Sequence, residues 1–87
     1  MYNKKYRLKS IDTTINSSMY DELLGKVCYP AYFNRGEHGW FLCDVEGSEL
    51  FVHRIRTSPI KDVRYTISNQ IIVVTENTTY VFEEDKT

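Results

Sequence analysis

The fold is decided by the stretch from Glu49 to Glu83, which reads ELFVHRIRTSPIKDVRYTISNQIIVVTENTTYVFE. It is rich in Val, Ile, Thr, Tyr and Phe, the residue types that are enriched in β-strands. Turn residues interrupt it at Ser58-Pro59, at Ser68-Asn69 and at Glu76-Asn77. The stretch therefore predicts several short antiparallel strands that are joined by tight turns.

One strand in this stretch is expected to have a single apolar face, and another to be apolar on both faces. Val63, Tyr65 and Ile67 alternate with polar residues, which is the pattern of a strand packed on one side. The segment Ile71–Thr75 is apolar on both faces, as is typical of a strand in the middle of a sheet. We therefore expect Ile71–Thr75 to be the central strand.

The last turn determines the register of the final strand pair. If Thr75 and Thr79 flank this turn, apolar residues of the two strands face each other across the sheet. This register predicts two apolar pairs, Val74 with Tyr80 and Ile72 with Phe82.

The amino-terminal part predicts an edge strand and one short helix. The segment Met1–Asn16 is polar and lightly alternating, which suits an edge strand. The helix is expected near residues 18–25, because Ser18 is a good N-cap and Asp21 suits the positive end of the helix dipole. Gly25 then ends the helix.

The segments Lys26–Phe33 and Gly39–Val45 are predicted to form a hairpin. In this hairpin Cys28 lies nearly opposite Cys43, as two buried thiols that oxidation can bridge. Pro30 cannot donate a ladder hydrogen bond and belongs at an edge or a bulge. The two faces of the second strand are Phe41, Cys43 and Val45, toward the core, and Trp40 with Leu42 on the other side. A further hairpin turn is expected at Glu46-Gly47-Ser48.

These elements predict one small, mainly β domain over residues 1–87, with residues 1–5 and 84–87 frayed. Five or six strands and one short helix fit a strongly bent antiparallel sheet or an SH3-like or OB-like barrel, because bending or closure protects sheet edges. The alternative is an open sheet with the helix across one face.

Composition excludes some classes of function and location. The formal net charge is −1, whereas a general nucleic-acid-binding surface requires a strongly basic balance. No apolar run approaches the length of a membrane span, and no apolar segment follows the basic amino terminus, so we expect a cytoplasmic protein. The basic amino end is either a solvated segment or an arm that binds anions. The two cysteines and two histidines lack zinc-site spacing, and no cofactor is expected.

Two polar clusters are candidates for binding. The first consists of His53, Arg54, Arg56, Thr57 and Ser58. Arginine forks suit phosphate or carboxylate groups, and the hydroxyls add hydrogen-bond donors. Alternatively, Arg54 or Arg56 forms an ion pair with Asp62 or Asp44.

The second cluster lies in and beside the longest loop and consists of Arg35, His38 and Trp40, with Glu37 beside them. Exposed Trp and Arg dominate binding hot spots, although Trp40 can instead fill the space under the helix. Tyr29, Tyr32 and Phe33 extend this aromatic surface in the binding interpretation, and can stack bases as in single-strand binders. No spacing brings together a nucleophile, a base and an orienting group, so an enzyme is not expected.

Four segments resemble small β-rich proteins of phages and mobile elements of gut-type Firmicutes. They are GKVCYP (Gly25–Pro30), GWFLCDV (Gly39–Val45), HRIRTSPI (His53–Ile60) and IVVTENTTYVF (Ile72–Phe82). The resemblance implies a compact β fold of mobile-element origin. By association, it also implies an inhibitor of host defence, as anti-CRISPR and other anti-defence proteins are.

The leading hypothesis is a non-enzymatic inhibitor that blocks a host defence protein or sequesters a nucleotide-like signal. It would use the Arg35–Trp40 loop and the His53–Ser58 strand end. The alternatives are a nucleic-acid-binding small barrel, and a structural or assembly subunit. Self-association is expected, because a chain of this size has difficulty covering an apolar sheet face.

Overall fold

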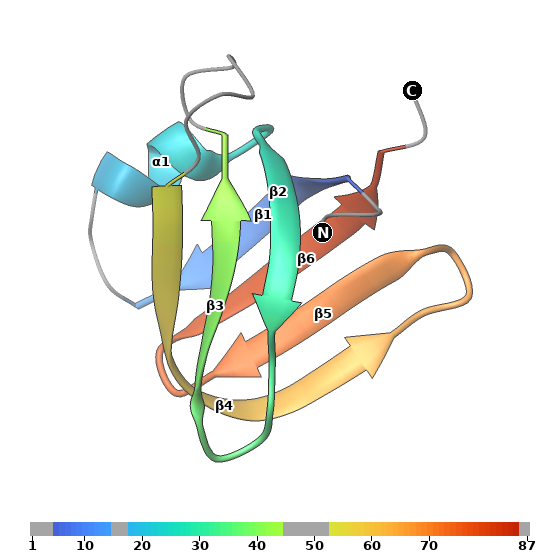
Figure 1. The fold of residues 1–87 in the computed structure, drawn as a ribbon. Helices are drawn as coiled ribbons and strands as arrows, with labels where there is room; N and C mark the ends of the chain where they lie inside the picture. Colours follow the sequence, from blue (N-terminus) through green and yellow to red (C-terminus); the bar gives the residue numbers. More distant parts are fainter. Residues whose placement is uncertain (1–4, 15–17, 45–52, 86–87) are drawn as a thin grey trace.

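The computed structural model describes residues 5–14, 18–44 and 53–85, and these form a closed antiparallel barrel of six strands with one short helix (Figure 1). The elements are β1 (Tyr6–Thr13), α1 (Ser18–Leu23), β2 (Val27–Tyr32), β3 (His38–Cys43), β4 (His53–Tyr65), β5 (Gln70–Thr75) and β6 (Thr78–Glu84). Each strand pairs with the next one in the chain, and β6 pairs with β1. The mainly β prediction is confirmed in its barrel form, and the open sheet is not formed.

Closure makes β1 an internal strand, so the prediction of an edge strand is wrong. β1 pairs with β2 at Tyr6 and Arg7, and with β6 along its length. The fraying of residues 1–5 and 84–87 stays a prediction; among the described residues, the backbone N–H of Asp85 donates to the carbonyl of Lys5 at 2.8 Å. Residues 1–4 and 86–87 lie outside the described part of the chain.

The core fills the inside of the barrel and is built around three rings. Phe41 meets Phe82 edge to face at a centroid distance of 5.0 Å, and Tyr80 at 5.7 Å. Leu23 of α1 joins this cluster, which attaches the helix to the barrel. The helix ends at Leu23, and Gly25 follows it with a positive φ of 79°, which suits a residue without a Cβ and agrees with the predicted glycine stop. The predicted capping by Ser18 involves a side chain outside the described part.

The β2–β3 hairpin follows its prediction closely. Cys28 lies directly opposite Cys43, and their Sγ atoms are 3.5 Å apart as free thiols. The register shifts just after Pro30, so the proline stands at the predicted bulge. Phe41 and Cys43 are both buried in the core. The predicted turn at 46–48 and the residues up to 52 lie outside the described part.

The prediction of a turn at Ser58-Pro59 is wrong, because β4 is one strand of 13 residues that continues through the proline. The strand changes partner here. Up to and including Pro59 it pairs with β3, and from Ile60 onward it pairs with β5. A proline is tolerated at such a corner, because its missing N–H interrupts neither ladder.

The β5–β6 register differs by one residue from the predicted one. Val73 lies opposite Tyr80, Ile71 opposite Phe82, and Val74 opposite Thr79. The cause is a two-residue turn between Thr75 and Thr78. The Thr75 hydroxyl donates to the carbonyl of Thr78 at 2.8 Å and accepts from its N–H at 3.0 Å.

The prediction that Tyr65 and Ile67 face the core is also wrong. The β4–β5 hairpin extends to one side of the barrel (Figure 1). Tyr65 is the last residue of β4, and Ile67 lies in the turn before β5 begins at Gln70. Tyr65 is 73% exposed and Ile67 is fully exposed. The turn itself is as predicted, with Asn69 in the left-handed region at φ 63°. Among the described residues, no helix has the length and apolar character needed to cross a membrane.

Candidate functional site: a ring–arginine pocket on the barrel wall

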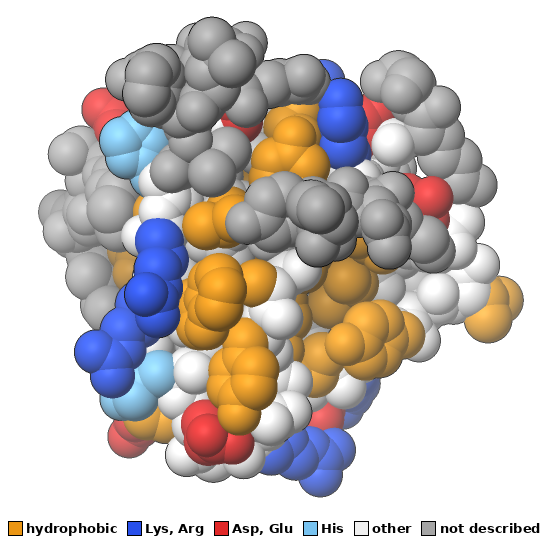
Figure 2. Space-filling view, viewed as in Figure 1, with side chains coloured by type: hydrophobic (Ala, Val, Ile, Leu, Met, Phe, Trp, Pro, Cys, Tyr) orange, Lys and Arg blue, Asp and Glu red, His pale blue; other side chains and the backbone are white. Residues whose placement is uncertain are grey.

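A pocket of about 480 Å³ lies on the outer wall of the barrel, over β2, β3, the start of β4 and the β2–β3 turn. Its lining combines aromatic and charged side chains: Tyr32, Gly36, Glu37, His38, Trp40, Arg54 and Arg56. Figure 2 shows a stripe of basic side chains next to hydrophobic ones on this face of the molecule. We call this region the ring–arginine pocket.

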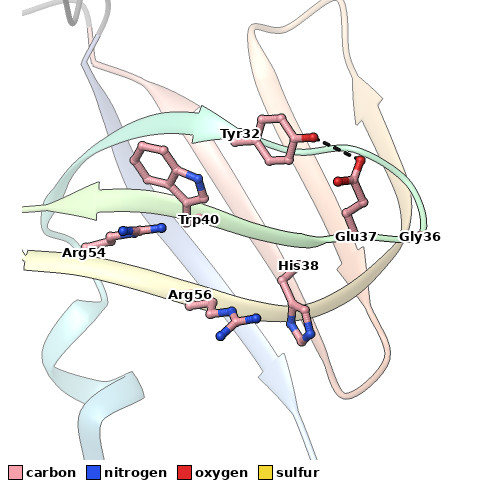
Figure 3. A pocket seen from close by; sticks show the side chains of 7 residues that line it. All are labelled: Tyr32, Gly36, Glu37, His38, Trp40, Arg54 and Arg56. Atoms are coloured by element: carbon pink, nitrogen blue, oxygen red, sulfur yellow. Dashed lines mark hydrogen bonds between the residues drawn. The ribbon is translucent and has the colours of Figure 1, made fainter.

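Strand register places the central residues of the pocket in one row. Trp40 pairs with Tyr32 on one side and with Arg56 on the other. Successive side chains of a strand point to opposite faces of a sheet, so these three point outward while Phe41 and Ile55 point into the core. The alternation that builds the core therefore also builds the pocket (Figure 3).

The second arginine, Arg54, stacks against the indole of Trp40. Its guanidinium carbon lies 4.7 Å from the ring centroid, which is within the range of a cation–π contact. The contact restricts the long Arg54 side chain, so that less conformational entropy is lost when its N–H groups bind a ligand. Trp40 is half-buried and lines the pocket on the barrel wall, whereas α1 packs on the core through Leu23, so Trp40 does not fill the space under the helix.

The alternative in which Arg54 or Arg56 pairs with Asp62 is wrong. Asp62 accepts from Arg35 at 2.8 Å and from Arg64 at 2.9 Å, and these hydrogen bonds, that of Arg64 first, hold the pKa of its carboxyl below the usual value. Among the described residues, no acidic side chain lies within ion-pair distance of Arg54 or Arg56.

Glu37 and Tyr32 form the loop end of the pocket and were not among the predicted site residues. The hydroxyl of Tyr32 donates to Glu37 Oε2 at 3.0 Å, and the amide of Asn34 reaches the Tyr32 hydroxyl at 2.9 Å (Figure 3). These contacts fix one ring and one carboxylate at the edge of the pocket. The sequence signal for Tyr32 is the aromatic run beside the loop, which predicts this residue as an extension of the aromatic surface.

His38 is anchored at one ring nitrogen. Its Nδ1 lies 2.8 Å from the carbonyl oxygen of Thr57, and because a carbonyl only accepts, Nδ1 carries the proton. The buried hydroxyl of Thr57 accepts from the N–H of Gly39 at 2.9 Å and donates to the carbonyl of Ser58. At Gly39, an added Cβ would clash with the side chains of Ile60 and Phe33 and with the backbone oxygen of Tyr32 in β2, so there is no space for a larger residue.

The structure therefore brings together four of the eight predicted site residues, His38, Trp40, Arg54 and Arg56. Thr57 lies behind the pocket wall, with its hydroxyl committed to the backbone. Ser58 accepts a hydrogen bond from Asn77 at 3.1 Å, on the other side of the strand corner. His53 pairs with Cys43 at the far end of β3, and Arg35 extends away to Asp62.

The Cys28–Cys43 pair is a second reactive group, but it is sealed in the core. Both thiols are fully buried. The hydrogen bond between them and burial raise the pKa of Cys28, while the same hydrogen bond lowers the pKa of Cys43. A buried thiol is inert toward solutes, so this pair does not extend the pocket.

The described residues contain no group of three His, Cys, Asp or Glu side chains that could hold a metal ion. Comparison of the chain with models of known protein families, with curated proteins and with solved structures finds no match. The ring–arginine pocket is therefore the feature on which a functional interpretation rests.

Proposed function

We propose that the protein is a non-enzymatic binding protein and that the ring–arginine pocket holds its partner. The observation that carries the proposal is two aromatic rings set beside two arginines that have no acidic partner among the described residues. Trp, Tyr and Arg are the residue types that dominate binding hot spots. An arginine left without a counter-ion on a rigid strand is available to an anionic group of a partner.

The resemblance to phage and mobile-element proteins suggests the kind of partner that the pocket binds. The protein would act as an inhibitor that either occupies a surface of a host defence protein or sequesters a nucleotide-like signal. Both actions need only binding, and both would use the same rings and arginines.

A single-stranded nucleic acid is the second candidate. It is favoured by the alignment of rings and cations across three neighbouring strands, since bases stack on aromatic side chains while arginines contact phosphates. Its signature is an affinity that falls steeply as ionic strength rises from low to moderate values.

An assembly subunit is the third candidate. The sheet face that motivated self-association is turned into the barrel core, so among the described residues its support now comes from the hairpin tip with Tyr65 and Ile67. Light scattering would decide this, because a strictly monomeric protein contradicts it.

The main proposal is tested by recovering the tagged protein from a bacterial host and identifying bound proteins and small molecules by mass spectrometry. The parent is compared with Trp40→Ala and Arg56→Ala, and with Arg35→Ala as the control that removes an arginine outside the pocket. We expect the parent and the control to retain the same partner and the two pocket variants to lose it while remaining folded. Retention by both pocket variants would show that the pocket is not the binding site.

A further inference from the structure

The rings of Tyr32 and Trp40 form a platform on the outer wall of the barrel. The two residues are cross-strand partners on β2 and β3, so their side chains start only about 5 Å apart. Figure 3 shows both rings on the same face of the two strands, above the arginines of β4 in this view. Stacking of a base on an aromatic side chain contributes to binding with every base, because each base has a π-face.

The two arginines form one edge of this platform. Arg54 and Arg56 are two positions apart on β4, so they leave the strand on the same face about 7 Å apart. Stacking on Trp40 restricts one of them, and neither has a described acidic partner. Planar guanidinium groups bind phosphate oxygens through paired N–H donors.

A carboxylate stands at the opposite, loop end of the pocket. Glu37 accepts hydrogen bonds from the Tyr32 hydroxyl at 3.0 Å and from the Asn34 amide at 3.4 Å, which fix its orientation. A carboxylate only accepts hydrogen bonds, so it favours a base edge that donates them. Cytosine, adenine and guanine carry amino groups that donate, whereas uracil presents a carbonyl oxygen at the position of the cytosine amino group.

Taken together, the pocket has two aromatic rings on the barrel wall, a cationic edge and an anionic end. We infer that it binds a nucleoside phosphate whose base carries an amino group, an inference that rests on the proposed binding function. The base stacks on Tyr32 and Trp40 with its amino edge toward Glu37, and the phosphate lies against Arg54 and Arg56. The volume of about 480 Å³ lies within the range of small-ligand pockets. An acidic peptide would satisfy the arginines but would be repelled by Glu37.

The test uses the single tryptophan of the chain, Trp40, whose fluorescence reports on the pocket directly. The protein is titrated with CMP, AMP, GMP and UMP, with cytidine and with inorganic phosphate. The same affinities are then measured independently by calorimetry. CMP and UMP form the matched pair, because they differ at the base edge that would face Glu37. We expect at least one amino-bearing nucleotide to bind about tenfold or more tightly than UMP, cytidine and phosphate.

Three variants separate the parts of the inference. Arg56→Ala is expected to weaken nucleotide binding about tenfold or more, while Arg35→Ala leaves it unchanged. Glu37→Gln should reduce the preference for CMP over UMP, because an amide both donates and accepts. Equal binding of UMP and the amino-bearing nucleotides, or an unchanged preference in Glu37→Gln, would overturn the assigned base chemistry.

Two further measurements complete the test. One identifies the source of the ligand, and the other separates failure of this inference from failure of the proposed function. A short oligocytidylate that binds much more tightly than CMP, with strong salt dependence, supports the same chemistry and assigns a nucleic-acid strand as the source. Equal affinities support a free nucleotide. If no nucleotide binds at millimolar concentration but Arg56→Ala still loses the partner recovered from cells, the inference fails and the binding function stands. If that partner is also retained, both fail.

Discussion

The two halves of β4 carry similar side chains but leave them in different electrostatic surroundings. In the half after Pro59, Asp62 accepts hydrogen bonds from Arg64 on its own strand and from Arg35 of the β2–β3 turn. In the half before Pro59, Arg54 and Arg56 lie beside two aromatic rings, and no described carboxylate is within ion-pair distance of either arginine. Exposed arginines therefore do not by themselves indicate a binding site. The informative feature is an arginine whose counter-ion the fold does not supply.

The largest expected effect is the difference in stability between a substitution at an inward-facing position of β4 and one at an outward-facing position. Ile60→Ala should lower the free energy of unfolding by about 2–5 kcal/mol, because Ile60 is buried in the core. Arg56→Ala should change it by no more than about 0.5 kcal/mol, because its side chain is exposed. Urea unfolding measures both values.

If Ile60→Ala is too unstable to purify, Ile60→Val retains most of the packing and should lose about 0.5–1.5 kcal/mol. An Arg56→Ala loss as large as that of the Ile60 variant would mean that Arg56 belongs to the framework, and the contrast between the two halves would disappear.

An intermediate effect is expected at Thr57, which faces inward in the binding half. Thr57→Val leaves the buried N–H of Gly39 without its acceptor, which should cost about 1–3 kcal/mol of stability. Thr57→Ser keeps the hydroxyl and should retain most of that stability. Thermal unfolding of the two variants side by side provides the measurement, and equal loss in both would mean that the methyl group matters more than the hydrogen bond.

The smallest effect is expected at Asp62, in the half with paired charges. The pKa of Asp62 in the folded protein lies below that of the unfolded chain, so its ion pairs stabilise the fold above the unfolded value and lose this effect as the pH falls through the folded value. Asp62→Asn should therefore lower the urea midpoint slightly at neutral pH, and the difference should vanish in acid.

An NMR titration of the Asp62 carboxyl tests the assigned cause. Arg64→Gln should raise the pKa of Asp62 more than Arg35→Gln does, because the hydrogen bond from Arg64 is the larger influence. A pKa that neither substitution moves would contradict the charge pairing, and with it the electrostatic contrast along β4.

The sequence alone was sufficient to predict the features that depend on the alternation of apolar and polar residues along a strand. The β-rich fold, the Cys28–Cys43 pairing and the inward position of Phe41 all follow from period-two patterns in short strands. The same pattern predicted that Trp40 lies on the opposite face of its strand from Phe41.

Features that depend on side-chain hydrogen bonds or on strand length could not be predicted in this way. The Thr75 hydroxyl closes a two-residue turn and moves the register of β6 by one residue. Continuation of β4 through Pro59 required a change of partner strand, which no local signal reports. The role of Glu37 came from its contact with Tyr32, and this contact depends on the loop geometry.

Closure of the barrel has a consequence for how the chain folds. The β1–β6 ladder joins residues that are 65 or more positions apart, such as Thr13 and Thr78, whereas the β2–β3 and β5–β6 hairpins join near neighbours. Hairpins form within about 1–10 microseconds, but bringing distant segments together has a larger loop entropy to overcome. The strand pair that removes the last free edge is therefore the slowest to find its register, and the ring–arginine pocket, which lies on the local strands, can take shape before the barrel closes.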